Sequence, residues 1–424
     1  MKASMRLPLS LLAAVPFLMV LGNSMLFPTF PKMQSALHLT GLQTSLVVTA
    51  FSVPAGLLIP LAGYLSDRYG RKPVMAPAIL LFGVGALIAG LSLSFLGSAA
   101  YVGLITGRII QGAGAAGMAQ LAMALTADIF KSGERAGVLG LLEAANGLGK
   151  VISPIAGAVA GLVLWLLPFY VFAALALPLG ILLFLFVREP KAKRKQVPLG
   201  KYLKEIGTVF GQKGASLGVL LAAGTVVLFI LFGTLFYLSE VLEKRYGMSE
   251  LSSGFILALP VGALSLTSFL VGRYLQKQSR YAKLVIVSGI LVIAGVMVVN
   301  ALFQDRWVLF SAISLMGVGG GFVLPTLTLL ITSSTALAQR GMVTSLYGGV
   351  RFFGVALGPP TFGWLMHQGT ALLFFSAAAL LGLTATLTWF FLQLRQMLRA
   401  TAQPKPRRPA FQIAFSPPRP REGS

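Results

Sequence analysis

The sequence contains no cysteine in 424 residues and only two histidines, His38 and His367. The absence of cysteine excludes disulfides, thiolate metal sites and cysteine nucleophiles. Two histidines so far apart in the chain argue against a histidine metal site. We therefore expect no bound metal and no cofactor.

Charge is also scarce. Only 11% of the residues are charged, whereas an ordinary soluble domain carries about 25%. Hydrophobic residues make up 56% of the chain, and the mean hydropathy is +0.84. Such a chain cannot cover a globular surface with polar groups, which excludes a soluble enzyme and a nucleic-acid-binding protein. The composition predicts an integral membrane protein, embedded in the lipid bilayer.

Long apolar runs are abundant. A helix needs roughly 20 apolar residues to cross about 30 Å of hydrocarbon. Stretches of this length, separated by charged or turn-rich breaks, occur at 7–30, 41–63, 74–95, 99–126, 136–160, 164–187, 216–240, 250–272, 283–303, 307–333, 341–365 and 370–394. The sequence therefore predicts an all-α membrane protein with twelve transmembrane helices.

The basic residues test this count and give an orientation. Lysine and arginine outnumber aspartate and glutamate by 34 to 11. If the N-terminus is cytoplasmic, 27 of the 34 lie in cytoplasmic segments and four in outer loops, while Arg108, Lys150 and Arg351 lie inside spans. Cytoplasmic loops of membrane proteins carry such an excess of positive charge. We expect a multi-pass protein of the cell membrane with both termini cytoplasmic.

The chain divides into two similar halves. Overlaying 112–158 on 317–363, at an offset of 205 residues, pairs Gly112 with Gly317, Gly149 with Gly354 and Pro154 with Pro359. We expect two pseudo-symmetric six-helix bundles at 1–187 and 216–395, a cytoplasmic linker at 188–215 and a disordered, basic, proline-rich tail at 396–424. Repeats of this kind place a substrate site near mid-membrane, between the halves.

The loop after the second predicted span has a specific pattern. Residues 63–73 read GYLSDRYGRKP, in which the glycines permit a tight turn and the charges can pair with one another or with helix ends. The run resembles the signature loop of the major facilitator superfamily, which implies a twelve-helix transporter. The resemblance gives a conformational role to Gly63, Asp67, Arg68, Gly70 and Arg71. The matching segment of the second half is degenerate, with Gln276 where Asp67 stands.

Two further segments resemble motifs of the same superfamily. In the fourth span, Arg108 belongs to a run resembling the second motif. It either binds backbone carbonyls of neighbouring helices or responds to a nearby carboxylate. The fifth span resembles the third motif, which in the superfamily marks drug/proton antiporters, through Gly140, Gly149, Ser153, Pro154 and Gly157. The eleventh span repeats this feature with Gly354 and Pro359, and all these glycines and prolines are expected to set helix packing.

Few ionisable residues lie deep in the spans. Glu143, Asn146 and Lys150 follow each other at i, i+3 and i+7, so they share one face of the fifth helix. Arg351 occupies the position equivalent to Asn146 in the second half. We expect Glu143 to bind the coupling proton, with Arg108, Asp67 and Asp128 as further candidates. The alternative is that Glu143 only neutralises a neighbouring lysine or arginine.

The candidate substrate-binding residues are Asn23, Phe27, Glu143, Asn146, Lys150, Tyr347 and Arg351. Many antiporters of this subfamily carry an acid in the first helix, where this chain has Asn23, an amide that cannot titrate. A cationic substrate could compete with the proton at Glu143, whereas Lys150 and Arg351 would suit an anionic or zwitterionic one.

The sequence thus predicts a monomeric secondary transporter that exports amphipathic drugs or other small molecules from a bacterial cell in exchange for protons. The alternative is a dedicated exporter of one endogenous metabolite, siderophore or lipid precursor. A membrane-embedded enzyme would need a nucleophile or a cluster of metal ligands in the spans, and the sequence has neither there. The two-half pattern argues against a passive channel, and the sequence does not exclude a non-transporting receptor.

Overall fold

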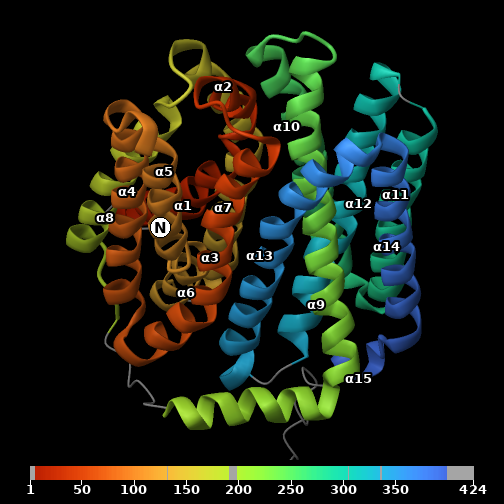
Figure 1. The fold of residues 1–424 in the computed structure, drawn as a ribbon. Helices are drawn as coiled ribbons and strands as arrows, with labels where there is room; N and C mark the ends of the chain where they lie inside the picture. The colour runs from red at the N-terminus through yellow and green to blue at the C-terminus, as the bar shows by residue number, and fades with distance from the viewer. Residues whose placement is uncertain (1–4, 131, 191–197, 304, 335–336, 399–424) are drawn as a thin grey trace, which may run out of the picture.

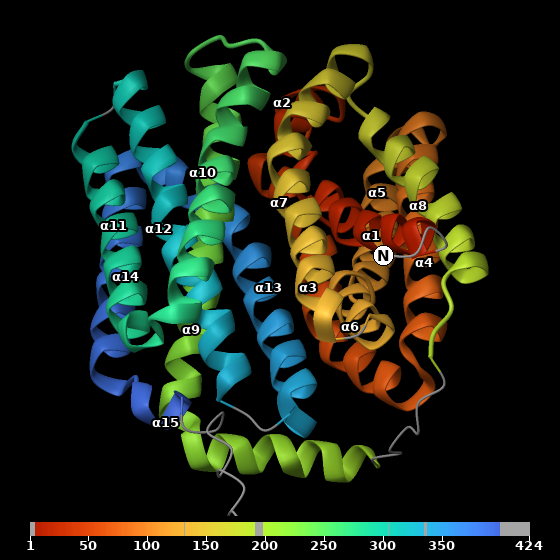
Figure 2. The same cartoon turned by 180° about the vertical axis from the view of Figure 1, so that it is seen from behind.

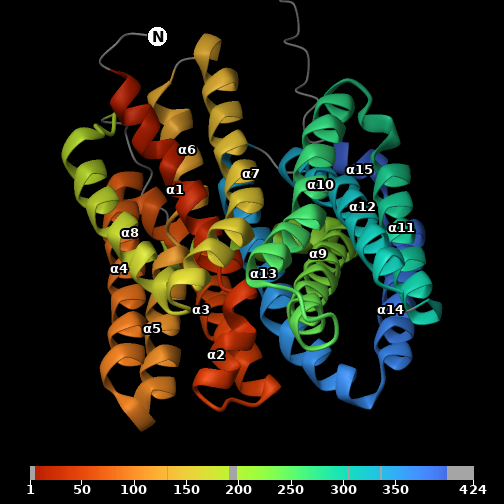
Figure 3. The ribbon, with the colours of Figure 1, turned by 90° about the horizontal axis from the view of Figure 1, so that it is seen from above.

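The computed structural model describes residues 5–130, 132–190, 198–303, 305–334 and 337–398. Within these ranges the protein is helical and contains no β-strand. Two groups of roughly parallel helices stand side by side, one from each half of the chain (Figures 1 and 3). The predicted disordered tail, from residue 399, and the linker residues 191–197 lie outside the described residues.

The first half contains eight α-helices. They are α1 (Arg6–Ser24), α2 (Phe30–Ala36), α3 (Gly41–Tyr69), α4 (Arg71–Phe95), α5 (Ala100–Ala115), α6 (Ala119–Ile129), α7 (Ser132–Val163) and α8 (Leu167–Phe186). Thr40 caps α3, because its hydroxyl accepts a hydrogen bond from the Gln43 amide while the Gln43 side chain accepts one from the Thr40 amide. Gly70, with φ of 113°, lets the chain turn directly from α3 into α4.

The second half continues with α9 (Leu199–Lys244), α10 (Glu250–Lys277), α11 (Ala282–Leu302), α12 (Arg306–Ser333), α13 (Leu337–Gln368), α14 (Thr370–Phe391) and α15 (Leu394–Leu398). Asp305 caps α12 by accepting hydrogen bonds from the amides of Trp307 and Val308, at 2.9 and 3.3 Å. Helices α9, α13 and α14 pack together, and α12 lies against α10 and α11 (Figure 2).

Eleven segments of the described chain are long and apolar enough to span a membrane. The remaining predicted span, the eleventh at 341–365, lies within α13, whose 32 residues extend about 48 Å and so are long enough. Its glycines, prolines and polar residues make it less apolar than the others. The fold is therefore the predicted all-α bundle of two halves, in which one span is more polar than the rest.

Two predicted spans are interrupted. The fourth, 99–126, is divided into α5 and α6 at residues 116–118, where Met118 has φ −102° and ψ −89° and so cannot continue the helix. Glycine-rich sequence before this break packs tightly, since a Cβ at Gly114 would overlap the Phe82 amide of α4. In the first span, 7–30, α1 ends at Ser24, and Pro28 and Pro31 lie in the short helices that follow.

The linker predicted at 188–215 includes helical residues. Helix α9 begins at Leu199 and is kinked at Lys213, which has φ −134° and ψ 18°. The segment before the kink runs across beneath both groups of helices, and the remainder turns up into the second half (Figures 1 and 2). The Lys213 ammonium donates a hydrogen bond of 2.5 Å to the carbonyl of Ser334, which ties the kink to the end of α12.

The internal repeat appears as repeated packing. A Cβ at Gly112 would overlap the Phe51 carbonyl of α3, and one at Gly317 would overlap the Pro260 carbonyl of α10. The halves meet along two corresponding pairs of helices, α3 with α13 and α7 with α10. The offset of 205 residues read from the sequence therefore corresponds to a real two-fold relation in the fold.

Candidate functional site

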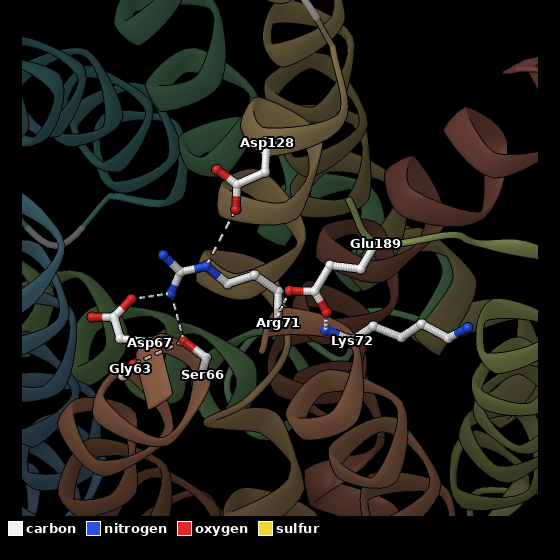
Figure 4. Close-up of polar contacts among 7 residues, drawn as sticks. All are labelled: Gly63, Ser66, Asp67, Arg71, Lys72, Asp128 and Glu189. Atoms are coloured by element: carbon white, nitrogen blue, oxygen red, sulfur yellow. Dashed lines mark hydrogen bonds and ion pairs between the residues drawn. The ribbon is translucent and has the colours of Figure 1, made fainter. Parts of the chain in front are cut away.

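The signature loop forms a charged cluster at one end of the first half, here called the loop end (Figure 4). The Arg71 guanidinium contacts the Asp67 carboxylate at 2.5 Å, donates to the Ser66 hydroxyl at 2.6 Å and lies 3.6 Å from the Asp128 carboxylate of α6. Arg68 instead donates to the Tyr64 hydroxyl at 3.3 Å. Asp67 and Asp128 are thus joined through one cation, so the cluster ties α3, α4 and α6 together.

Glu189 completes this cluster from beyond α8. Its carboxylate oxygens accept hydrogen bonds from the backbone amides of Arg71 and Lys72, at 2.9 and 3.1 Å (Figure 4). These amides begin α4, where the helix dipole favours a negative charge. Glu189 therefore caps α4 and holds the segment that follows α8 against the signature loop.

Arg108 lies in the interior of the first half. Its side chain is fully buried and donates hydrogen bonds to the carbonyls of Val47 and Gly22, at 3.1 and 2.9 Å, and to the Gln111 side chain at 2.7 Å. The guanidinium carbon lies 4.4 Å from the centre of the Phe51 ring. Within the described residues no carboxylate pairs with it. Arg108 therefore joins α1, α3 and α5, which matches the carbonyl-binding alternative considered from the sequence.

The glycines of the third motif pack α7 against α1. A Cβ at Gly157 would overlap the Met25 carbonyl, and one at Gly149 would lie 3.1 Å from the Phe17 carbonyl oxygen. The Ser153 hydroxyl donates to the Leu21 carbonyl at 3.4 Å. Gly140, by contrast, has open space around it. In the second half, a Cβ at Gly354 would overlap the Thr225 carbonyl of α9, the counterpart of α1.

The opposite face of the same helix meets the second half. The Pro154 carbonyl oxygen would lie 2.9 Å from a Cβ at Gly254 of α10. Nearer the middle of the helix, Gly147 faces Ser265 of α10. The counterpart contact joins α13 to α3: a Cβ at Gly56 would lie 2.9 Å from the Gly349 carbonyl oxygen. Backbones of the two halves thus approach closely along both seams.

Four predicted polar residues, Asn146, Lys150, Tyr347 and Arg351, lie near these seams together with Ser265, which the sequence did not single out, and we call these five the central polar cluster. Lys150 interacts electrostatically with both Glu143, on its own helix, and Arg351, on α13 of the other half. The Arg351 guanidinium lies 5.3 Å from the centre of the buried Tyr347 ring. The structure therefore brings five of the predicted site residues into one region: Glu143, Asn146, Lys150, Tyr347 and Arg351.

The other predicted binding residues lie elsewhere. Asn23 of α1 is nearly buried, with its side-chain oxygen lacking a hydrogen-bond partner among the described residues. Phe27 is buried, and its ring lies 5.2 Å from that of Phe30 and 6.0 Å from that of Phe232 across the interface between the halves. Phe27 thus contributes to an aromatic contact between the halves.

Polar contacts join the halves at the end opposite the signature loop. The Lys32 ammonium lies 2.7 Å from the Glu250 carboxylate of α10 and donates to the Gly161 carbonyl at 3.1 Å. The Lys244 ammonium pairs at 2.9 Å with Glu240, one turn earlier on the same helix α9, and crosses to the first half by donating a hydrogen bond of 2.7 Å to the Gln34 side chain. We call these contacts the opposite-end ion pairs.

Sequence reasoning did not single out the ion pair and the glycines that join the halves. Lys32 lies in a predicted outer loop and Glu250 at the start of a predicted span, but 218 residues separate these complementary charges. The Gly348-Gly349 pair was also visible, and the structure places a Cβ at Gly348 within 2.8 Å of the Gln120 amide of α6. Only the packing of the halves identifies which partner each of these residues meets.

A bundle of two repeated halves, with polar groups between them, is the architecture of a secondary membrane transporter. The model of the Major Facilitator Superfamily matches residues 12–354 and 282–420. The chain therefore belongs to the major facilitator superfamily and is a multi-pass membrane transporter.

Among curated proteins, the chain is 36% identical over 369 residues to the bacillibactin exporter of Bacillus subtilis (strain 168), covering 87% of this chain and 92% of the relative. It is 26% identical to multidrug resistance protein 2 of the same organism, covering 88% and 92%. The tetracycline resistance protein, class B, of Escherichia coli is 27% identical, covering 78% and 83%.

Solved structures share the fold. The human organic anion transporter TETRAN superposes with a TM-score of 0.71 at 19% identity, covering 92% of this chain and 100% of that chain. A bacterial homolog of the human lysosomal transporter Spinster, in an inward-facing and unoccupied conformation, gives 0.73 at 16% identity, covering 96% and 100%. At these identities the likeness concerns the fold alone.

Proposed function

We propose that this transporter exports small molecules from the cytoplasm in exchange for protons, by alternating access to the central polar cluster. The observation that carries the proposal is the electrostatic interaction of Lys150 with Glu143 and, across the interface, with Arg351. A proton bound or released at Glu143 changes the charge felt by groups of both halves. That change in charge can shift the equilibrium between conformations that differ in how the two halves are arranged.

Glu143 is the strongest candidate for the proton site because four other acids near the spans, Asp67, Asp128, Glu240 and Glu250, are each held in an ion pair. Asp67 and Asp128 share Arg71, and Glu240 and Glu250 form the opposite-end ion pairs. Glu143 is exposed and forms no ion pair within 4 Å in the described part of the chain. Each proton that moves inward through this site yields about 2.3 kcal/mol per 100 mV of membrane potential.

The export direction rests on the third motif and on the relatives, which include proteins named as an exporter and as multidrug and tetracycline resistance proteins. The basic loops support a cytoplasmic loop end. In that orientation two contacts between the halves, Lys32 with Glu250 and Lys244 with Gln34, close the outer side, and they must break for substrate to leave. The signature-loop cluster holds the cytoplasmic end of the first half as one unit during this exchange.

Everted membrane vesicles with a pH-sensitive dye test the proposal. Addition of a transported compound should release protons from energised vesicles containing the wild type. Glu143→Gln should reduce this signal to that of vesicles without the protein, at equal protein level, because the amide cannot titrate. Glu134→Gln, the same change in the exposed first turn of the same helix, should retain the signal.

Full proton exchange in Glu143→Gln would refute Glu143 as the proton site. Asp67 and Asp128 would then be tested by the same amide substitutions. Transport without proton movement by the wild type would refute antiport itself.

A dedicated exporter of one endogenous compound is a second candidate. It is favoured by the 36% identity to a relative named for a single compound, against 26–27% to multidrug and tetracycline resistance proteins. Competition against one transported probe by a panel of unrelated amphipathic drugs separates the two. Broad competition supports multidrug export, and competition confined to one chemical class supports a dedicated exporter.

A further inference from the structure

We propose that the central polar cluster binds the anionic group of the substrate, so that the protein exports organic anions and each cycle carries net positive charge inward. This inference rests on the proposed function and adds the chemical class of the substrate and the electrical consequence of moving it.

The first observation is an excess of positive charge without paired acids. Lys150 and Arg351 come from different halves and interact electrostatically with each other. Neither has a carboxylate within ion-pair distance among the described residues. Cations inside a membrane protein are costly unless they are paired or hydrated. An anion bound beside both would relieve their mutual repulsion.

The second observation is a set of polar atoms that lack partners in the same region. The Nε of Arg351 and the hydroxyl of Ser265 are buried without a hydrogen-bond partner among the described residues. Buried donors of this kind cost free energy until a ligand or water accepts from them. Guanidinium and hydroxyl groups are donors suited to an oxyanion such as a carboxylate or sulfonate.

The third observation is the position of the acids on the helices that surround the cluster. Asp67 on α3 and Asp128 on α6 lie at the loop end, and Glu250 on α10 lies at the opposite end, all in ion pairs. Glu143 supplies the nearby negative charge, about 10 Å from Lys150 along α7. With Glu143 ionised, the cluster still carries one net positive charge, and with Glu143 protonated it carries two.

Protonation of Glu143 removes a negative charge that repels an anion, so local electrostatics do not by themselves prevent proton and anion from binding together. Exchange therefore requires the conformational cycle to admit them alternately: the proton leaves to the cytoplasm before the anion binds, and the next proton binds from outside after the anion has left. One proton moving inward and one monovalent anion moving outward transfer two positive charges inward. A zwitterion would transfer one, and a monovalent cation would transfer none.

Proteoliposomes with an imposed membrane potential and no pH gradient test the inference. The probes are anilinonaphthalenesulfonate, a permanent monovalent anion, and ethidium, a permanent monovalent cation. A roughly tenfold potassium gradient with valinomycin sets the potential, worth about tenfold accumulation per charge. Because two charges move with each sulfonate, we expect the potential to drive its accumulation to a limit of about a hundredfold. The potential should not change the accumulation of ethidium, because its exchange for a proton moves no net charge.

Substitutions connect this response to the cluster. Lys150→Gln and Arg351→Gln should each lower sulfonate transport by about tenfold or more, the effect of one lost charge-assisted contact. Arg351→Lys should retain part of it. Lys150→Glu should lose the sulfonate and gain ethidium, a change that misfolding cannot produce. Thermal midpoints in detergent identify variants that fail to fold, and Lys150→Met, which also removes the charge, then replaces Lys150→Gln.

The outcomes separate this inference from the proposed function. Electroneutral exchange of ethidium for protons, with no sulfonate transport, would overturn the anion site and leave proton-coupled export in place. Sulfonate transport that is unchanged in both glutamine variants would also overturn the site. Absence of proton movement with every transported probe would overturn the proposed function itself.

Discussion

Arg108 shows how a charged residue can be a structural element of a membrane bundle. Its guanidinium donates hydrogen bonds to the carbonyls of Gly22 on α1 and Val47 on α3. We predict that Arg108→Ala destabilises the protein by about 3 kcal/mol or more, through lost hydrogen bonds and a cavity. The thermal midpoint in detergent measures this loss.

The matched control for that prediction is Lys204→Ala, which removes an exposed cation from the first part of α9. It should leave the thermal midpoint unchanged within about 0.5 kcal/mol. An Arg108→Ala protein as stable as the wild type would show that the hydrogen bonds of Arg108 do not hold α1, α3 and α5 together.

At this scale the sequence identified residues better than it identified their partners. It singled out Arg108, Glu143, Lys150 and Arg351 because an ionisable side chain inside an apolar run is conspicuous. It could not show that Arg108 binds carbonyls, since those acceptors belong to the backbone of helices up to 86 residues away. Backbone acceptors leave no signal in residue types.

At the scale of single elements, α7 carries two kinds of glycine. Gly157 lies against the backbone of α1, whereas Gly140 has open space. We predict that Gly157→Ala destabilises the protein by about 1–3 kcal/mol through overpacking. Gly140→Ala should stabilise the helix by about 0.5–1 kcal/mol, because alanine loses less backbone entropy.

Thermal midpoints and initial transport rates of the two variants check this prediction. The two substitutions are chemically identical and lie on the same helix, so only the surroundings of the added methyl group differ. Equal effects of both would mean that α1 and α7 do not pack as closely as the carbonyl of Met25 requires.

The signature loop is a second element whose role follows from one side chain. Arg71 bridges Asp67, Ser66 and Asp128, whereas the neighbouring Lys72 lies with its ammonium 5.0 Å from the Phe184 ring. We predict that Arg71→Ala lowers the transport rate several-fold at unchanged protein level, because two carboxylates lose their shared cation. Vesicle transport assays with Lys72→Ala as the control measure this effect, and a comparable loss in both would refute the bridging role.

At the scale of the whole molecule, the opposite-end ion pairs set a testable limit on movement. Lys32 and Glu250 belong to different halves, and their contact must open if the halves exchange access. We predict that a Lys32→Cys, Glu250→Cys double variant, joined by a short bismaleimide, loses transport. The chain contains no cysteine of its own, so the reagent acts only at the two introduced thiols.

Each single cysteine variant treated with the same reagent should keep transporting, because one thiol cannot be crosslinked between the halves. Full transport by the crosslinked protein, with crosslinking verified by gel mobility, would contradict alternating access at this end. Reactivity of the free thiols before and after energisation provides an independent measure of opening.

Apolar length and basic loops were enough to predict the helices and the two-half plan. They could not predict the break between α5 and α6, because Met118 leaves helical geometry where glycine-rich packing, rather than a proline, ends the helix. Nor could they show that residues from 199 are helical, since that segment lacks a span-length apolar run. Contacts between halves, such as Lys32 with Glu250, depend on how the bundles are set against each other.

The duplication of the bundle provides a built-in comparison. Where both copies keep the same residue, as Gly149 and Gly354 do against α1 and α9, the same close packing of two helices occurs once in each half. Where they diverge, as Asn146 and Arg351 do, the shared helix packing does not fix the residue type, and we propose that the difference reflects the substrate that passes between the copies. A comparison of equivalent positions in the two halves therefore distinguishes residues that set the helix packing from candidates for substrate binding within a single chain.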